Sequence, residues 1–429
     1  MTGEPDAPGA KKSAGAFRAY WALAALIVGL IAGDLSTALS AAIHDGVIGT
    51  ASFIGTLWLN ALKMTVIPLV VALLIVGIAK SAEAAHAGRI AGRSVLWIVI
   101  ICTLSAVFGA VAILLLTHFF PLSRETAAGL QTALGGIENK SPTSLPGVAD
   151  FFKGVIPDNV VAAAANGDIL PLVVFSVLFA LALGFISEAG RCSLVTFFEA
   201  VGDALLVVIE WVLWIAPLGV LSLALVVGSA AGGTAFSGLL HYIILISIVG
   251  ILVTVAAYPL AIILGRIAPG RFAGAIIPPF AVAISTRSSL ASLPAMLTAS
   301  KTMGIRDEVA DVSLPIAVAL FRATGPAMNV AVPFYIAHWL GLHPTLAQMI
   351  AATAVGAVMS YGAVSLPGEV TYISSIAPIA LALGVPIAPL ALLVAVEMVP
   401  DIFRTLGNVA MDVALAAVVN RSAKTAPES

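Results

Sequence analysis

Six long apolar segments constrain this chain more than any other feature of its sequence. A helix needs roughly 20 apolar residues to cross the hydrocarbon core of a bilayer, and each segment is long enough. Hydrophobic residues make up 60% of the chain and charged residues 10%, whereas a soluble domain has about 25% charged residues. The sequence therefore predicts a polytopic membrane protein. Its clear segments cover about residues 18–43, 50–79, 90–118, 168–188, 199–229 and 237–265.

Between residues 269 and 421 the apolar stretches are interrupted by clusters of serine, glycine and proline. One cluster runs from Ser285 to Pro294 and the other from Ser360 to Glu369. Backbone that leaves a helix at membrane depth is tolerated only inside the protein or beside a water-filled cavity. We therefore expect two re-entrant helical hairpins, at about 269–304 and 346–378, although ordinary loops outside the membrane would have the same composition.

Basic residues indicate which ends of the segments face the cytoplasm. With two re-entrant hairpins, most of them fall on one side, as the positive-inside rule requires, and both chain ends are then cytoplasmic. The expected outer ends carry Arg124, Lys140 and Lys153. Short loops and a high alanine and glycine content further suggest a bacterial inner membrane. The expected cytoplasmic ends carry Lys11, Lys12, Arg18, Lys80, Arg89, Arg93, Arg191, Arg266, Arg271, Lys301, Arg306, Arg421 and Lys424.

Polar residues recur at helical spacing in the last apolar stretch, so they share one face of a helix. Each charged group at the centre of a bilayer costs about 2.5 to 3.5 kcal/mol, which predicts a functional role for the stripe. A planar guanidinium such as Arg404 favours a carboxylate ligand, and Asp401 favours an amino acid over a plain dicarboxylate. These two residues could instead neutralise each other within the helix. The stripe consists of Glu397, Asp401, Arg404, Thr405, Asn408 and Asp412.

The interrupted hairpins and the striped helix together resemble the dicarboxylate/amino acid:cation symporter family, the glutamate transporter homologues. The resemblance implies an all-α polytopic fold with eight transmembrane helices plus two re-entrant helical hairpins, assembled as a homotrimer. It also implies a secondary transporter, not an enzyme, that works by an elevator-type alternating-access motion. The motifs that carry it are Leu62–Pro68, Val155–Asn159, Ala165–Pro171, Ala216–Gly219, Thr286–Pro294, Leu366–Gly368 and Asp401–Asp412.

The resemblance also implies a division into a scaffold and a moving transport domain. The transport domain would contain helices 3, 6, 7 and 8 and both hairpins. The expected ranges are a cytoplasmic tail at 1–17, scaffold helices 1–2 at 18–79, transport helix 3 at 88–118, the outer connection with scaffold helices 4–5 at 119–229, the rest of the transport domain at 237–421 and a second cytoplasmic tail at 422–429.

By motif match, the resemblance places the substrate site on the striped helix and the hairpin tips. Asp401 would bind the α-amino group of the substrate and Arg404 its side-chain carboxylate, with Thr405 and Asn408 assisting. Arg287 and Arg322 are candidates for pairing with acidic groups during movement. The first hairpin departs from the family in having a leucine where a third serine is common. Hairpin residues that would hold the α-carboxylate are Ser288, Ser289, Val364, Ser365, Pro367 and Gly368.

The seventh-helix region departs most from the family pattern. Family members carry Asn-Met-Asp-Gly-Thr there, which helps to build sodium sites, whereas Arg322–Pro333 contains no aspartate and offers only Asn329 as a similar amide. Asn408 and Asp412 would survive from another sodium site.

Two additional acids suggest proton coupling. Glu369 directly follows the Pro-Gly of the second cluster and Glu397 lies on the stripe. A carboxyl taken out of water holds its proton to higher pH. We expect coupling to protons through Glu369 or Glu397, to sodium, or to both. Glu369 could instead form a fixed bridge with Arg322 or Arg287.

Other functions stay open at this point. The reshaped pocket could accept a C4-dicarboxylate or a neutral amino acid, or the protein could conduct anions passively. An intramembrane enzyme is disfavoured because no histidine or lysine lies within the hairpin motifs to activate Ser288 or Ser289. The sequence has no nucleotide-binding motif and no metal-ligand spacing. We therefore expect no cofactor beyond a coupling ion and no nucleic-acid partner.

Overall fold

The computed structural model describes residues 8–86, 88–123, 125–128, 156–361 and 368–424. Every element in these ranges is a helix, as the sequence predicts. In chain order the elements are α1 (Pro8–Ser36), α2 (Ala41–His86), α3 (Arg89–Phe119), α6 (Val160–Asn166), α7 (Ile169–Ala182), η1 (Leu183–Phe185), α8 (Glu188–Trp214), α9 (Ala216–Ala231), α10 (Thr234–Pro259), η2 (Leu260–Leu264), α11 (Pro269–Thr286), α12 (Ser289–Thr302), α13 (Asp307–Leu320), α14 (Thr324–Leu340), α15 (Leu346–Tyr361), α16 (Gly368–Leu383), α17 (Ala388–Leu393) and α18 (Met398–Lys424).

Long apolar helices dominate the fold. Within the described ranges, six helical stretches are long and apolar enough to cross a membrane. Shorter apolar helices of 10–17 residues accompany them. The chain is accordingly a multi-pass membrane protein. The six stretches are Ala41–Ala85, Arg89–Phe119, Glu188–Trp214, Thr234–Leu264, Asp307–Leu340 and Met398–Ala423.

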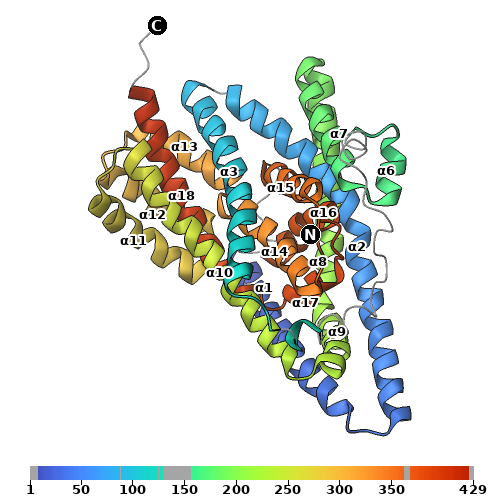
Figure 1. Cartoon of the computed structure of the whole chain (residues 1–429). Helices are drawn as coiled ribbons and strands as arrows, with labels where there is room; N and C mark the ends of the chain where they lie inside the picture. Colours follow the sequence, from blue (N-terminus) through green and yellow to red (C-terminus); the bar gives the residue numbers. More distant parts are fainter. Residues whose placement is uncertain (1–7, 87, 124, 129–155, 362–367, 425–429) are drawn as a thin grey trace, which may run out of the picture.

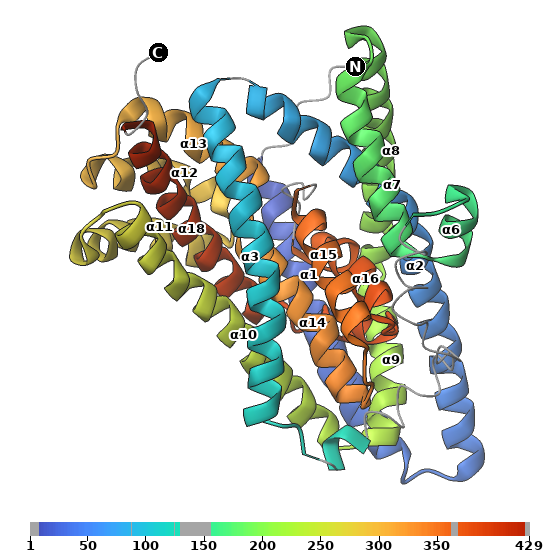
Figure 2. The same cartoon turned by 45° about the horizontal axis from the view of Figure 1, so that its top comes forward.

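The helices pack in two groups (Figures 1 and 2). In the first group, α2 packs against α7, α8 and α9, and α1 packs against α9. In the second group, α18 packs against α10, α11, α12 and α13, and α14 packs against α3. The α3–α14 contact is close because Gly109 has no side chain: a Cβ there would overlap the backbone of Ala327. The second group therefore surrounds α18.

Two helical pairs flank the predicted serine-rich clusters. The helices α11 and α12 pack against each other and are joined through Arg287 and Ser288, while α15 packs against α16. Arg287 has a positive φ of 49°, which reverses the chain direction between the two helices. These helices have 18, 14, 16 and 16 residues, fewer than the roughly 20 needed to span a bilayer alone. The break at the first cluster is confirmed. The second cluster falls mostly outside the described residues, and the re-entry of both pairs into the membrane stays a prediction.

The stretch expected to form the seventh helix is broken in two. Helix α13 ends at Leu320 and α14 begins at Thr324, with non-helical backbone between them. Two contacts fix this break: the Ser105 hydroxyl of α3 donates to the carbonyl of Ala323, and the Thr324 N–H donates to the Asn408 side-chain oxygen of α18 at 3.0 Å. The break therefore lies between α3 and α18.

Three predicted segments have the wrong boundaries. The segment at 18–43 crosses a break, because α1 ends at Ser36 and α2 begins at Ala41. The segment at 199–229 is not one helix, because α8 ends at Trp214 and α9 begins at Ala216. Pro217 lacks the N–H that a continuous helix would need there, and it is well suited to a first turn. The segment at 50–79 is part of a helix of 46 residues. Hydropathy marks only the apolar centre of such a helix and misses its more polar ends.

Candidate functional site

The polar stripe lies mostly on α18, with one correction. Glu397 is not in that helix but in the turn that precedes it. Proline at position 400 explains the break, because it has no N–H for a bond to the carbonyl four residues earlier but fits a first helical turn. The Asp401 N–H still bonds to the Glu397 carbonyl at 2.9 Å, so the turn leads directly into the helix. Glu397 consequently stays beside the stripe.

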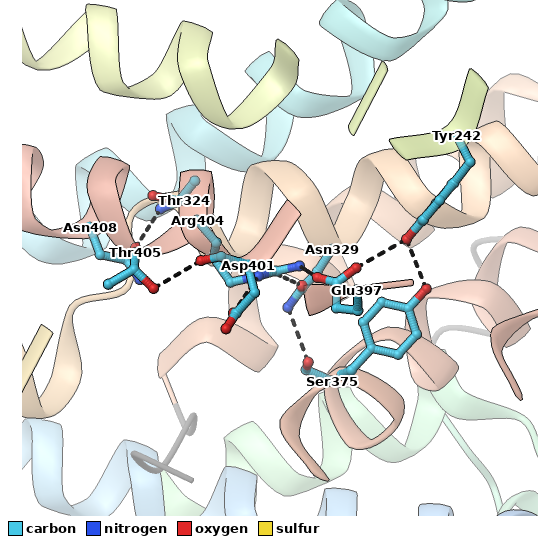
Figure 3. Close-up of polar contacts among 10 residues, drawn as sticks. Tyr242, Thr324, Asn329, Ser375, Glu397, Asp401, Arg404, Thr405 and Asn408 are labelled. Carbon is cyan, nitrogen blue, oxygen red and sulfur yellow. Dashed lines mark hydrogen bonds and ion pairs between the residues drawn. The ribbon is translucent and has the colours of Figure 1, made fainter. Parts of the chain in front are cut away.

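Arg404 is the centre of the site, as Figure 3 shows. One guanidinium nitrogen donates to a Glu397 carboxylate oxygen at 2.5 Å, and the other donates to the Asn329 side-chain oxygen at 2.6 Å. The remaining nitrogen, Nε, lies 3.7 Å from an Asp401 oxygen. We call these four residues the Arg404 cluster. The Asp401–Arg404 pair, which the sequence left open as an alternative, is thus present but is the longest of these contacts, and Glu397 is the closer acid.

A second set of hydroxyl groups holds the Arg404 cluster in place. The Tyr242 hydroxyl of α10 donates to Glu397 at 3.2 Å and lies 2.9 Å from the Tyr372 hydroxyl. Asn329 donates to the Ser375 hydroxyl at 3.1 Å. Tyr372 and Ser375 lie about one turn apart on α16. Helix α16 is therefore linked directly to Asn329 and, through Tyr242, to Glu397.

The cluster is mostly buried, and its small exposed fraction belongs to Arg404 and Asp401. The side chains of Arg404 and Asp401 are 15% and 16% exposed, whereas Glu397 is 4% exposed. An ion pair so far from bulk water is weakly screened, and removing one partner would leave an uncompensated charge. An anion that reaches Arg404 can therefore bind well only if it takes over the contacts of Glu397.

Another polar region lies further along α18. Asn408 accepts the bond from Thr324 at 3.0 Å, and Asp412 is fully buried. Neither carboxylate oxygen of Asp412 has a hydrogen-bond partner within the described part of the chain, and the same is true of Arg322 Nε. Thr405 donates to the Asp401 carbonyl at 2.9 Å. Asn408 and Asp412 thus lie beside the helix break, away from the Arg404 cluster.

The predicted hairpin residues are placed only in part. Ser288 caps the start of α12 by accepting a bond from Ala291 N–H at 3.3 Å, and Ser289 is the first residue of that helix. The charge of Arg287 acts on Asp401, so the first hairpin tip lies near the site. Gly368 begins α16. Outside the described residues are Val364, Ser365, Pro367 and the side chain of Glu369.

Sequence reasoning missed Tyr242, Tyr372 and Ser375. Each is a polar residue within an apolar helix, which is the only local signal they give. Asn329 was predicted as a candidate ion ligand, and the structure places it against Arg404 and Ser375. No group of three or more histidine, cysteine, aspartate or glutamate side chains suited to a metal was found among the described residues.

The sequence is similar to those of several bacterial transport proteins. It is 30% identical over 381 residues to the proton/sodium-glutamate symport protein of Bacillus subtilis (strain 168), covering 85% of this chain and 84% of that protein. It is 25% identical over 400 residues to the proton/glutamate-aspartate symporter of Escherichia coli (strain K12), covering 91% and 89%. It is 26% identical over 374 residues to the C4-dicarboxylate transport protein of Laribacter hongkongensis (strain HLHK9), covering 83% and 80%.

The match to a family extends over almost the whole chain. Residues 19–422 match the sodium:dicarboxylate symporter family. This range includes both broken helical pairs, the α13–α14 break and the Arg404 cluster. It is a family of secondary transporters, not of enzymes, and its matched relatives couple substrate movement to cations. The chain therefore belongs to the sodium:dicarboxylate symporter family.

Proposed function

We propose that the protein is a proton-coupled symporter of an acidic amino acid, aspartate or glutamate, in the bacterial inner membrane. One observation carries this proposal: Arg404 is already bound by an internal carboxylate, that of Glu397, at 2.5 Å. The guanidinium presents several N–H donors to carboxylates and cannot be deprotonated in a protein. The site is therefore suited to exchanging one carboxylate for another.

Competition for Arg404 supplies a coupling mechanism. Ionised Glu397 and the side-chain carboxylate of the substrate would both need the same guanidinium nitrogens. When Glu397 takes up a proton, its attraction for Arg404 weakens and the guanidinium becomes free to bind the substrate. The Tyr242 and Tyr372 hydroxyls can then reorient around the protonated acid. One proton would thus enter the protein with one substrate anion.

The remaining substrate contacts follow from the position of the cluster. Asp401 would bind the α-amino group of the substrate, and the tips of the two hairpins would bind the α-carboxylate. Helix N-termini favour anions, and α12 begins at the Ser288 cap near Asp401. A division into scaffold and transport domains, an elevator-type motion and a homotrimer belong to this proposal. The two helix groups support the division.

Uptake into liposomes tests the proposal. Purified protein would be reconstituted and given labelled L-aspartate, first under an inward proton gradient without sodium and then under an inward sodium gradient at equal pH on both sides. We expect concentrative uptake with the proton gradient alone. Uptake that occurs only with sodium would refute proton coupling, and aspartate-induced current without accumulation would instead indicate a passive anion conductor.

A C4-dicarboxylate is the second candidate substrate, because such transporters occur among the relatives at similar identity. The Asp401→Asn variant separates the two classes. We expect it to lose at least about tenfold in aspartate affinity, since the α-amino group loses its charged partner. Succinate, which lacks an amino group, should bind no less tightly than to the wild type. If wild-type protein binds succinate and not aspartate, the amino acid assignment is wrong.

A further inference from the structure

Asp412 is a charged side chain in an unusual setting. It is 0% exposed, and neither of its oxygens has a hydrogen-bond partner in the described ranges. A buried carboxylate is expensive unless it is hydrogen-bonded or opposed by a positive charge. The question is which positive charge compensates it.

The helix break brings Arg322 to this position. Its two neighbours toward the C-terminus are fixed, because Ala323 accepts a bond from Ser105 on α3 and Thr324 donates to Asn408 on α18. Asp412 lies four residues after Asn408, so both side chains share one face of α18. The break thus places the backbone of Arg322 beside the part of α18 that carries Asp412.

The charged neighbours of Arg322 lie on α18, and the charged neighbour of Asp412 lies in the helix break. Arg322 interacts electrostatically with Asp401, Arg404 and Asp412. Among the described residues, Arg322 is the only charged side chain that acts electrostatically on Asp412. Neither Arg322 nor Asp412 forms an ion pair with a described residue at 4.0 Å or less. Arg322 Nε also has no hydrogen-bond partner among the described residues. Arg322 and Asp412 therefore attract each other through charge across low-dielectric protein, without a hydrogen bond between them.

We infer that Arg322 is a built-in counter-charge for Asp412 and takes the place of a bound cation, so that this part of the site needs no sodium ion. The sequence supports the exchange, because Arg322 occupies the region that lacks the family's aspartate-containing motif. This inference deepens the proposed function by explaining why a proton can suffice. It concerns cation binding alone and can be tested without any substrate.

Thermal unfolding of the purified protein in detergent provides the test. Tm would be measured without substrate in sodium chloride and in choline chloride at equal concentration. We expect no sodium-specific change in the wild type or in Arg322→Lys, the matched control that keeps the charge. Arg322→Gln leaves Asp412 uncompensated, and saturating sodium should raise its Tm by roughly 5 °C. The double variant Arg322→Gln/Asp412→Asn should again ignore sodium.

Three outcomes would overturn the inference. The first is a sodium-specific rise in wild-type Tm that Asp412→Asn abolishes, because Asp412 would then bind sodium in spite of Arg322. The second is an Arg322→Gln variant that folds and does not respond to sodium. The third applies if Arg322→Gln cannot be purified: rescue by adding Asp412→Asn supports the charge pair, and failure of that rescue contradicts it. A failed uptake experiment would leave all these measurements unaffected, so the two proposals can fail separately.

Discussion

Arg404 and Asp412 lie on the same side of α18, and their buried charges are compensated in opposite ways. Arg404 is hydrogen-bonded to Glu397 and Asn329 and remains 15% exposed. Asp412, about 12 Å further along α18, is fully buried and has no hydrogen bond from any described residue. Hydrogen bonds can be handed from one partner to another, whereas a charge balance at a distance is fixed by the fold. The comparison indicates one exchangeable region and one permanent region.

Replacing Arg404 should have the largest effect on the exchangeable region. We expect Arg404→Ala to weaken aspartate binding about 100-fold or more, because two charge-assisted hydrogen bonds to the substrate are lost. Arg404→Lys should recover only part of that loss, since lysine is a point charge. Equilibrium binding of labelled aspartate measures this, with Arg89→Ala on the exposed start of α3 as a control. Wild-type affinity in Arg404→Ala would show that the substrate binds elsewhere.

Replacing Glu397 should remove the competition for Arg404. Wild-type affinity for aspartate should fall as the pH rises from about 5.5 to 8, because ionised Glu397 increasingly occupies the guanidinium; the side chain of free aspartate stays ionised throughout, since its ordinary pKa is about 3.9. Glu397→Gln should give a flat pH profile and bind aspartate about tenfold more tightly than the wild type at pH 8. The matched control is Glu199→Gln, which removes an ion pair with Lys80 far from the cluster. An unchanged pH dependence in Glu397→Gln would eliminate Glu397 as the proton carrier.

A smaller change should sharpen the role of the hydroxyl groups. Tyr242→Phe removes one donor to the ionised form of Glu397, and such a bond contributes about 0.5–1.5 kcal/mol. The midpoint of the pH profile for aspartate binding should therefore move upward by about one pH unit or less. Tyr258→Phe, on the same helix α10, should leave the midpoint unchanged. A downward shift would mean that Tyr242 stabilises the protonated acid instead.

Sequence periodicity located the site because most of the stripe lies on one helix. Asp401, Arg404 and Asn408 are neighbours through local helical geometry, which is readable from spacing. Tyr372 and Ser375 contact the site from α16, which is distant in sequence. No local sequence pattern predicts such a contact. Glu397 illustrates an intermediate case: its nearness to Arg404 was predictable, but the turn before Pro400 was not recognised. Hydropathy likewise found the apolar helices and failed where proline at 217 starts a new one.

The charges described around the site carry a final consequence. Three arginines, Arg287, Arg322 and Arg404, face three acids, Glu397, Asp401 and Asp412. When all six are ionised, their net charge is zero. In the proposed cycle, bound aspartate adds one negative charge and one proton on Glu397 cancels it. Membrane potential acts only on net charge, at about 2.3 kcal/mol per elementary charge for each 100 mV. A transport domain loaded in this way would cross the bilayer without sensing voltage, and the pH difference alone would set how far the substrate accumulates.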